Sequence, residues 1–264
     1  MDESQFQLLR SVGFVAAAGL ALCIQRLRPH APLSGSWRVN VAFWGINVVV
    51  MGVVCGACAC AVALWAETAG IGLFNVAPTD PWLGIAVTIL ALDLVSYGWH
   101  RANHQIPFLW RFHQVHHSDL TFTTSTALRF HPGELLLSLP LRLAAVIVLG
   151  ASPIGIVIFE ILFAVANFFE HGNIDLPLRL ERRLAYLWIT PALHRRHHST
   201  QVRELNRNFG TIFVLWDRIL RTHLESSSAQ TVTSGLPYSA EASTLRQALV
   251  LPFRNPSRLH SAVA

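Results

Sequence analysis

The sequence predicts an all-α integral membrane protein, a bundle of four to five helices with a histidine-rich metal-binding cap on the cytoplasmic side. The 264 residues are 52% hydrophobic and only 13% charged, whereas about one-quarter of an ordinary soluble domain is charged. The hydrophobic residues gather in long runs, as membrane-spanning helices require. Ten of the 13 histidines fall between His100 and His198, which is unusual for a packed core and typical of metal sites.

The apolar runs define the helices in chain order. Residues 7–27 form the first run, and residues 39–65 form a second that is long enough to cross a bilayer with some tilt. Residues 82–99 form the third. Residues 134–169 are nearly continuous, but Gly and Pro at 150–153 divide them into two arms. This division predicts either two crossings or a tight helical hairpin.

The arginines predict the orientation of the helices, because positive charge concentrates on the cytoplasmic side. The segments that follow the first run, the third run and the second arm all carry arginines, whereas the segment after the second run carries only Glu67 and Asp80. We therefore expect an external amino terminus and cytoplasmic histidines. Residues 1–6 are acidic and polar, so no cleavable signal peptide is expected. The arginines flank apolar runs without a nucleic-acid-binding motif, which argues against a nucleic-acid partner.

Three regions follow from this pattern. Residues 1–81 hold the amino-terminal membrane helices, residues 82–223 hold the histidine clusters, and residues 224–264 are predicted to be a loose polar tail. Helical spacing of the apolar side chains at 209, 213, 216 and 220 predicts one interfacial helix over 206–223.

Four cysteines lie inside apolar runs, at positions 23, 55, 58 and 60. Cys55 and Cys58 have the spacing of a redox or zinc pair. Their surroundings of small residues favour helix packing instead.

Eight of the histidines form three clusters, and His131 and His171 stand alone between them. The clusters are His100-x-x-x-His104, His113-x-x-His116-His117 and His194-x-x-His197-His198. A single zinc ion takes three or four ligands, so this inventory predicts two metal ions. Iron is favoured because two redox-active ions can activate O₂. Soluble di-iron bundles rely on carboxylates, but Glu134, Glu160 and Glu170 are too few and too scattered to be the main ligands.

Two polar residues precede the first cluster at helical spacing. Asp93 and Tyr97 share a stripe with His100 and His104 on one helix. An ionisable residue within the bilayer is usually functional, so we expect Asp93 to orient a ligand or to bond Tyr97. The alternative is a buried polar residue that only pairs helices.

A membrane metal transporter or metal-binding protein without oxidase activity is the alternative function. Transporters place their ligands near the bilayer midplane, on broken helices. Here the clusters fall at and beyond the helix ends, which favours an enzyme.

The residues around the histidines are similar to those of a known family. The motifs are Val115-His-His-Ser, Thr124-Ser-Thr-Ala-Leu-Arg-Phe-His131-Pro-Gly-Glu134, Glu170-His171-Gly-Asn173, Thr190-Pro-Ala-Leu-His194-Arg-Arg-His197-His198-Ser, and Asn208-Phe-Gly with Trp216-Asp217-Arg218. Together they resemble the fatty acid hydroxylase/sterol desaturase superfamily of integral-membrane non-heme di-iron enzymes, and most of all its bacterial sterol-desaturase-like branch. The resemblance covers about residues 93–222.

The resemblance implies a function and a ligand set. It implies O₂-dependent hydroxylation or desaturation of a sterol, fatty acyl or related lipid in a bacterial inner membrane, with residues 82–223 as the catalytic domain. Electrons would come from a ferredoxin or cytochrome b5-type donor. Asp93, Tyr97 and Asn173 would support the ligands. The two iron ions would be held by His100, His104, His113, His116, His117, His194, His197 and His198, with His171 and His131 as further candidates.

Three departures from the family pattern concern the substrate. The first cluster has three intervening residues, whereas fatty acid 2-hydroxylases tend to have four. The third cluster ends in Ser199 without a third adjacent histidine. Ile-Leu-Arg-Thr222 follows Arg218, where the family often has Leu-Phe-Gly-Thr.

Overall fold

The secondary structure is helical throughout the described part of the chain. The structure, a computed structural model, describes residues 3–32, 35, 37–55, 58–77, 79–225, 232–238 and 242–254. These residues form helices, loops and isolated β-bridges, with no strand among them. The predicted all-α class is confirmed.

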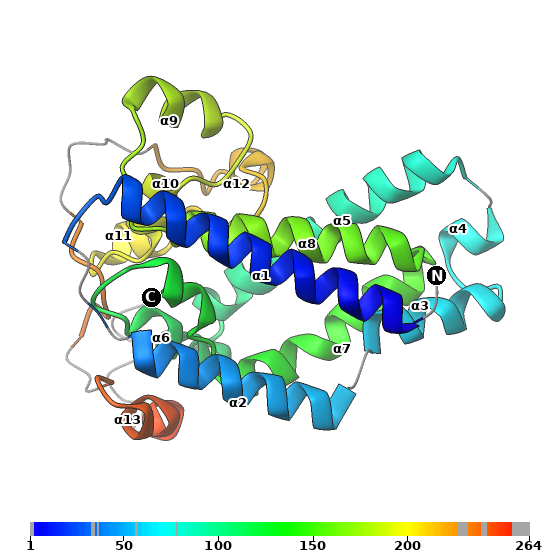
Figure 1. The fold of residues 1–264 in the computed structure, drawn as a ribbon, viewed down its shortest axis with the longest axis horizontal. Helices are drawn as coiled ribbons and strands as arrows, with labels where there is room; N and C mark the ends of the chain where they lie inside the picture. The colour runs from blue at the N-terminus through cyan, green and yellow to red at the C-terminus, as the bar shows by residue number, and fades with distance from the viewer. Residues whose placement is uncertain are drawn as a thin grey trace.

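Five segments are long and apolar enough to cross a membrane, which is the upper value of the predicted range. In Figure 1 the longest helices run along the long axis of the molecule, with the short helices α9 to α12 gathered at one end. The five segments are α1 (Glu3–Leu27), α2 (Trp37–Cys55) with α3 (Cys58–Thr68) and α4 (Leu73–Val76), α5 (Pro81–Gln105), α7 (Pro132–Leu149) and α8 (Pro153–Glu170).

The predicted break at 150–153 separates α7 from α8. Gly150 ends α7 in the left-handed conformation with φ 64°, which glycine adopts without the steric cost of a Cβ. Ser152 then caps α8 by accepting a hydrogen bond from the Gly155 N–H, and Pro153 opens the first turn. Each arm has 18 residues, about 27 Å of helix at 1.5 Å per residue.

The third predicted helix is longer than its apolar run. α5 continues past residue 99 to Gln105, so the stripe that begins at Asp93 and ends at His104 lies on one helix, as predicted. After Ile106 the chain turns into α6 (Pro107–His117), whose last two turns carry the second histidine cluster.

The predicted interfacial helix over 206–223 is wrong. Only α12 (Leu215–Ile219) is helical there, after the short helix α11 (Val202–Leu205). Between them, the backbone N–H groups of Phe209 and Gly210 donate to Asp217, and those of Ile212 and Phe213 donate to Asp93. These N–H groups are therefore committed to carboxylates and are not available for helical hydrogen bonds.

The carboxy-terminal segment is not loose where the structure describes it. Ser234 forms a bridge with Ser199, and α13 (Leu245–Val250) begins with a capping box. Ala248 and Leu251 are buried against Phe43 and Val115. The segment therefore packs beside the second histidine cluster.

The cysteines are described in part. Cys60 is buried in the core beside Phe6 and Leu92, and Cys23 is an exposed free thiol. The side chains of Cys55 and Cys58 lie outside the described residues, so their predicted packing role stays a prediction.

Candidate metal centre

Three helices and one helix end bring the histidines together. α5 supplies His100 and His104, α6 supplies the second cluster, and α10 (Pro191–His197) with its last cap residue supplies the third. His171 follows the last residue of α8. Thr190 accepts a hydrogen bond from the Leu193 N–H and so fixes the start of α10.

Nine histidines form two groups whose nitrogens lie within 4.8 Å of one another inside each group. The five-histidine group contains one residue that is half-buried, His100, and four that are buried; in the four-histidine group all are buried. The five-histidine group is His100, His104, His113, His117 and His197, and the four-histidine group is His116, His171, His194 and His198.

Adjacent histidines separate into different groups. His116 and His117 are neighbours on α6, and His197 and His198 are neighbours at the end of α10, yet each pair contributes one member to each group. Successive side chains on a helix diverge by about 100°, so a His-His pair points in two directions. The rings of His117 and His198, which belong to different groups, stack with centroids 4.2 Å apart.

The outer nitrogens of four of these histidines are hydrogen-bonded to oxygen acceptors. The Nδ1 of His100 donates to the Phe209 carbonyl at 2.8 Å, that of His197 to the Arg207 carbonyl at 2.7 Å, and that of His171 to the Asn167 carbonyl at 2.7 Å. The His113 Nδ1 donates to Glu134 at 2.9 Å. A donor Nδ1 fixes the tautomer and leaves Nε2 as an electron-pair donor, the arrangement usual for histidines that bind metals.

Some inner nitrogens lie at hydrogen-bond distance from one another, and others have no partner. The Nε2 of His171 lies 3.0 Å from that of His116 and 2.9 Å from that of His194. Buried polar atoms ordinarily have a hydrogen-bond partner, so unpartnered nitrogens in such number indicate ligands of a cation. The unpartnered nitrogens are His100 Nε2, both nitrogens of His104, His116 Nδ1, His117 Nδ1, His194 Nδ1, His197 Nε2 and both nitrogens of His198.

Burial keeps the imidazoles outside the membrane helices neutral. Desolvation lowers the pKa of His171 to about 4 and that of His197 to about 3. Desolvation and the neighbouring imidazoles lower the pKa of His116, His117, His194 and His198 well below the usual value. Neutral imidazole is the form that binds metals, so the donor set fits two first-row transition metal ions.

Two carboxylates join the centre. Glu134 accepts from Asn103 at 3.1 Å as well as from His113, and its second oxygen has no partner. Glu170 lies 3.7 Å from His171 Nδ1 and 3.8 Å from His194 Nδ1. Sequence reasoning placed both glutamates near the clusters but gave neither a role. The only sequence signal was their position in the motifs around His131 and His171.

The three residues predicted to support the histidines, Asp93, Tyr97 and Asn173, form their hydrogen bonds with other parts of the fold and not with histidine nitrogens. Asp93 accepts hydrogen bonds from Ile212, Phe213 and the Trp216 indole rather than from Tyr97. The Tyr97 hydroxyl pairs with Thr222 at 2.8 Å.

The third of these residues, Asn173, belongs to a different part of the fold. Its side chain bonds the backbone of Ala31, and its own N–H donates to Gln25. Asn173 therefore fixes the segment after α1 next to the end of α8.

His131 lies outside both groups, unlike the other nine histidines that the sequence predicted as ligands. Its Nδ1 accepts from the Gly133 N–H at 3.0 Å and caps α7, while its Nε2 donates to the Leu249 carbonyl at 3.3 Å. Both nitrogens are therefore used in the fold.

A cavity of about 250 Å³ leads from the membrane helices to the histidines. Its walls include Phe14, Trp44, Trp99, Leu135 and Phe163. At one end it reaches members of both groups, namely His100, His113, His116, His171 and His194. A mostly apolar cavity with a few polar groups is typical of a ligand site.

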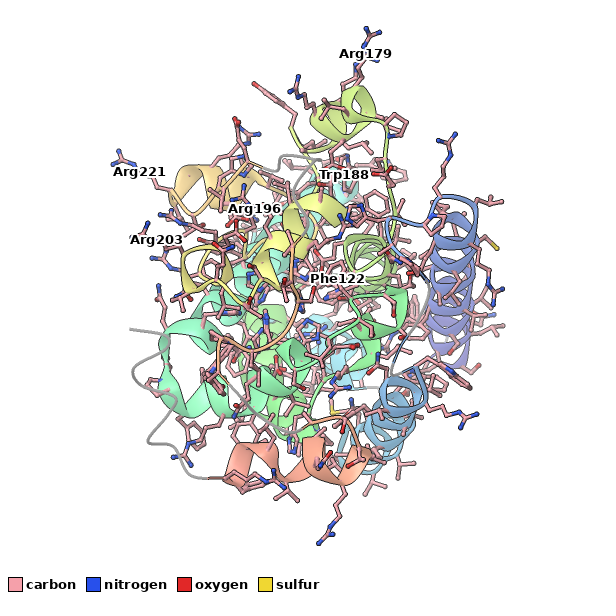
Figure 2. The ribbon with its side chains drawn as sticks, turned by 90° about the vertical axis from the view of Figure 1, so that its left-hand side faces the viewer. Phe122, Arg179, Trp188, Arg196, Arg203 and Arg221 are labelled. Atoms are coloured by element: carbon pink, nitrogen blue, oxygen red, sulfur yellow. The ribbon has the colours of Figure 1, made fainter. Side chains whose placement is uncertain are left out.

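The histidine end of the molecule also presents an arginine-rich surface. Figure 2 views this end, with Phe122 inside the cap and with Arg179, Arg203 and Arg221 extending outward. The Phe122 ring lies 5.1 Å from that of His198, so this aromatic side chain covers the four-histidine group.

The sequence of this region matches a known protein family. The model of the fatty acid hydroxylase family matches residues 85–222, slightly more than half of the chain. The chain belongs to the fatty acid hydroxylase family. The family match includes both histidine groups and Glu134, and it confirms the resemblance drawn from the motifs.

Several relatives share part of this fatty acid hydroxylase region. The ornithine lipid hydroxylase of Rhizobium tropici is 31% identical over 68% of this chain and 54% of its own length. Cholesterol 25-hydroxylase of Rattus norvegicus is 27% identical over 52% of this chain and 46% of its own length. Human alkylglycerol monooxygenase is 28% identical over 57% of this chain and 32% of its own length. The chain therefore spans about half or less of each relative, and no solved structure matches it.

Proposed function

We propose that this protein is a membrane-bound, O₂-dependent lipid hydroxylase that uses two non-heme iron ions. The observation that carries the proposal is the cavity, which opens among apolar membrane helices and ends at both histidine groups. The names of the relatives, which are lipid hydroxylases and monooxygenases, support the same reaction class.

The protein residues would position the substrate and the metal ions. When bound, iron supplies the oxygen activation that no amino-acid side chain provides. The aromatic and aliphatic walls hold an acyl or sterol chain and exclude water from the reacting carbon. Glu134 and the Phe209 carbonyl orient His113 and His100, so that their Nε2 atoms face the same end of the cavity.

The reaction needs two electrons from outside the chain. The outward arginines of the cap would bind an acidic donor, a ferredoxin or a cytochrome b5-type protein, by charge complementarity. This surface, the predicted topology and the motifs together support a bacterial inner-membrane protein whose active site faces the cytoplasm.

The alternative of a metal transporter has less support. The histidine groups lie at the ends of α5 and α8 and on the short helices α6 and α10, whereas transporters bind ions near the bilayer midplane. Vesicles containing the protein should show no uptake of radiolabelled iron beyond that of protein-free vesicles. Uptake that saturates with iron would support transport instead.

Iron stoichiometry tests the metal assignment. After anaerobic reconstitution, the protein should hold two iron ions per chain. The double variant His116→Ala/His197→Ala removes one ligand from each group and should lose most of this iron, because metal affinity depends on the complete ligand set. Unchanged iron in the double variant would contradict the assignment.

Lipid analysis tests the reaction. Cells that contain the protein should accumulate a lipid heavier by one oxygen atom than its precursor, and cells with the double variant should not. A lipid that instead lacks two hydrogen atoms would identify a desaturase. If both lipid profiles match that of cells without the protein, the proposal fails.

A further inference from the structure

The far end of the cavity contains a charged side chain that the metal centre does not use. Arg142 on α7 lines the cavity on the same face of the helix as Glu134, Leu135 and Ser138. It lies eight residues from Glu134, which corresponds to about 12 Å along the helix axis. Arg142 is also exposed on the surface of the bundle, so it lies where the cavity meets the lipid.

Arg142 lacks a protein partner in the described part of the chain. Its guanidinium interacts with the Phe163 ring, with the guanidinium carbon 6.0 Å from the ring centroid. The neighbouring polar groups are already bonded, because Ser138 donates to the Leu135 carbonyl and Ser96 to the Leu92 carbonyl, both at 2.8 Å. The guanidinium is therefore free to bind a ligand.

A second cavity adjoins the larger one at Arg142. A space of about 150 Å³ is lined by Arg142, Val95 and Ser96, which also line the larger cavity, and it extends to Arg10 and Glu160. There, Arg10 forms an ion pair with Glu160. Of the two arginines that line this space, Arg10 is paired with a carboxylate and Arg142 is not.

An arginine without a partner inside a bilayer is costly and is usually functional. Its planar guanidinium binds carboxylate and phosphate oxygens through paired hydrogen bonds. Resting on the proposed function, we propose that Arg142 binds an anionic oxygen group of the lipid substrate, a carboxylate or a phosphate. The chain of that lipid then runs along α7 toward the histidines, over the roughly 12 Å of helix axis that separates Arg142 from Glu134.

The experiment measures binding without turnover, so it does not depend on the reaction. The full-length protein, in nanodiscs of neutral lipid and without added iron, is titrated with three probes of equal chain length: a fatty acid, a lysophosphatidic acid and the fatty alcohol. We expect at least one anionic probe to bind about tenfold more tightly than the alcohol. Whichever anion shows the preference identifies the source of the anionic group.

Matched variants locate the preference. Arg142→Gln should bind all three probes with similar affinity, and Arg142→Lys should keep part of the preference. Arg179→Gln removes the same charge from the exposed cap and should behave as the wild type. Equal binding of anionic probes and alcohol by the wild type, or a full preference in Arg142→Gln, would overturn the proposal. Failure of the proposed function would appear separately, as missing iron or missing product.

Discussion

Hydrogen bonds to the outer nitrogens decide which way the histidines point. The four Nδ1 atoms that donate to oxygen belong to His100, His113, His171 and His197, and His113 alone among them donates to a carboxylate. An acidic acceptor increases the basicity of the ligand nitrogen on the other side of the ring. Glu134 is therefore the residue through which the metal affinity of the five-histidine group is best tested.

Glu134→Ala should weaken iron binding by about 10- to 100-fold, as loss of a carboxylate behind a ligating histidine typically does. Glu134→Gln, whose amide oxygen still accepts from His113, should recover part of this loss. Iron affinity is measured by competition with a chelator. Glu160→Ala, another membrane carboxylate that pairs with Arg10, is the control and should leave iron affinity unchanged.

His131→Ala should keep both iron ions and lower stability. The side chain caps α7 through Nδ1, and loss of a helix cap costs about 1 kcal/mol. His131→Asn should restore the cap. Thermal unfolding in detergent measures the first effect, and iron content measures the second. A loss of one iron ion in His131→Ala would return this histidine to the ligand set.

The grouping of the histidines was largely predictable from the sequence, and the exception, His131, has a physical reason. Spacing on a helix is local information, so the stripe on α5 and the pairs on α6 and α10 follow from residue numbers alone. The role of a lone histidine depends on what the fold places beside it. His131 meets the Gly133 amide and the distant Leu249 carbonyl, whereas His171 meets two other imidazoles.

At the scale of elements, two carboxylates hold the loop that supports His100. Asp217 accepts from the Phe209 and Gly210 amides, and Asp93 accepts from the next part of the same loop. Burial raises the pKa of Asp217 even though these hydrogen bonds oppose the shift. The loop in turn presents the Phe209 carbonyl to His100.

Asp93→Ala should loosen this loop. It removes the acceptor of three donors, two of them backbone amides, and each unsatisfied buried donor costs about 1–3 kcal/mol. The amides of Ile212 and Phe213 should exchange with deuterium at least about tenfold faster. Asp80→Ala removes an exposed helix cap from the opposite end of α5, and it should leave exchange in the loop unchanged.

The same contacts explain why helical spacing failed over 206–223. The apolar side chains do recur at helical intervals, but of the four only Phe209 is buried, Leu220 is exposed, and the buried Ile212 and Val214 lie off the pattern. The backbone conformation is decided instead by Asp93, a residue more than a hundred positions earlier. Local periodicity contains no information about such a partner.

At the scale of the whole molecule, the carboxy-terminal segment packs beside the five-histidine group. The Tyr238 hydroxyl accepts from the Trp110 indole at 3.1 Å and donates to Gln114 at 2.6 Å. The Trp110 ring lies 5.0 Å from that of His104 and 5.4 Å from that of His117. A segment distant in sequence therefore supports one wall of the five-histidine group.

Tyr238→Phe should lower the thermal unfolding temperature and speed the loss of iron to a chelator. It leaves the buried indole N–H of Trp110 without its acceptor, at a cost of about 1–3 kcal/mol. Tyr186→Phe removes a hydroxyl from a side chain that is 78% exposed and should change neither property. Iron release from Tyr238→Phe at the wild-type rate would show that the segment does not protect the centre.

The membrane bundle was predictable because long apolar runs leave few alternatives in a bilayer. The packing of residues 232–238 and 242–254 was not, since they are two short segments set in a polar stretch and their partners lie far away in the sequence. Their order depends on a few anchor points, such as the Arg129 guanidinium that donates to the Ala242 carbonyl at 2.6 Å.

The two His-His pairs couple the geometry of the two histidine groups. Each pair ties the two histidine groups together through a single peptide bond, on α6 and at the end of α10. A rotation of either helix that improves one group necessarily disturbs the other. The register of these two short helices therefore sets the spacing between the two histidine groups, and insertion of one residue ahead of either pair would move histidines out of both groups at once.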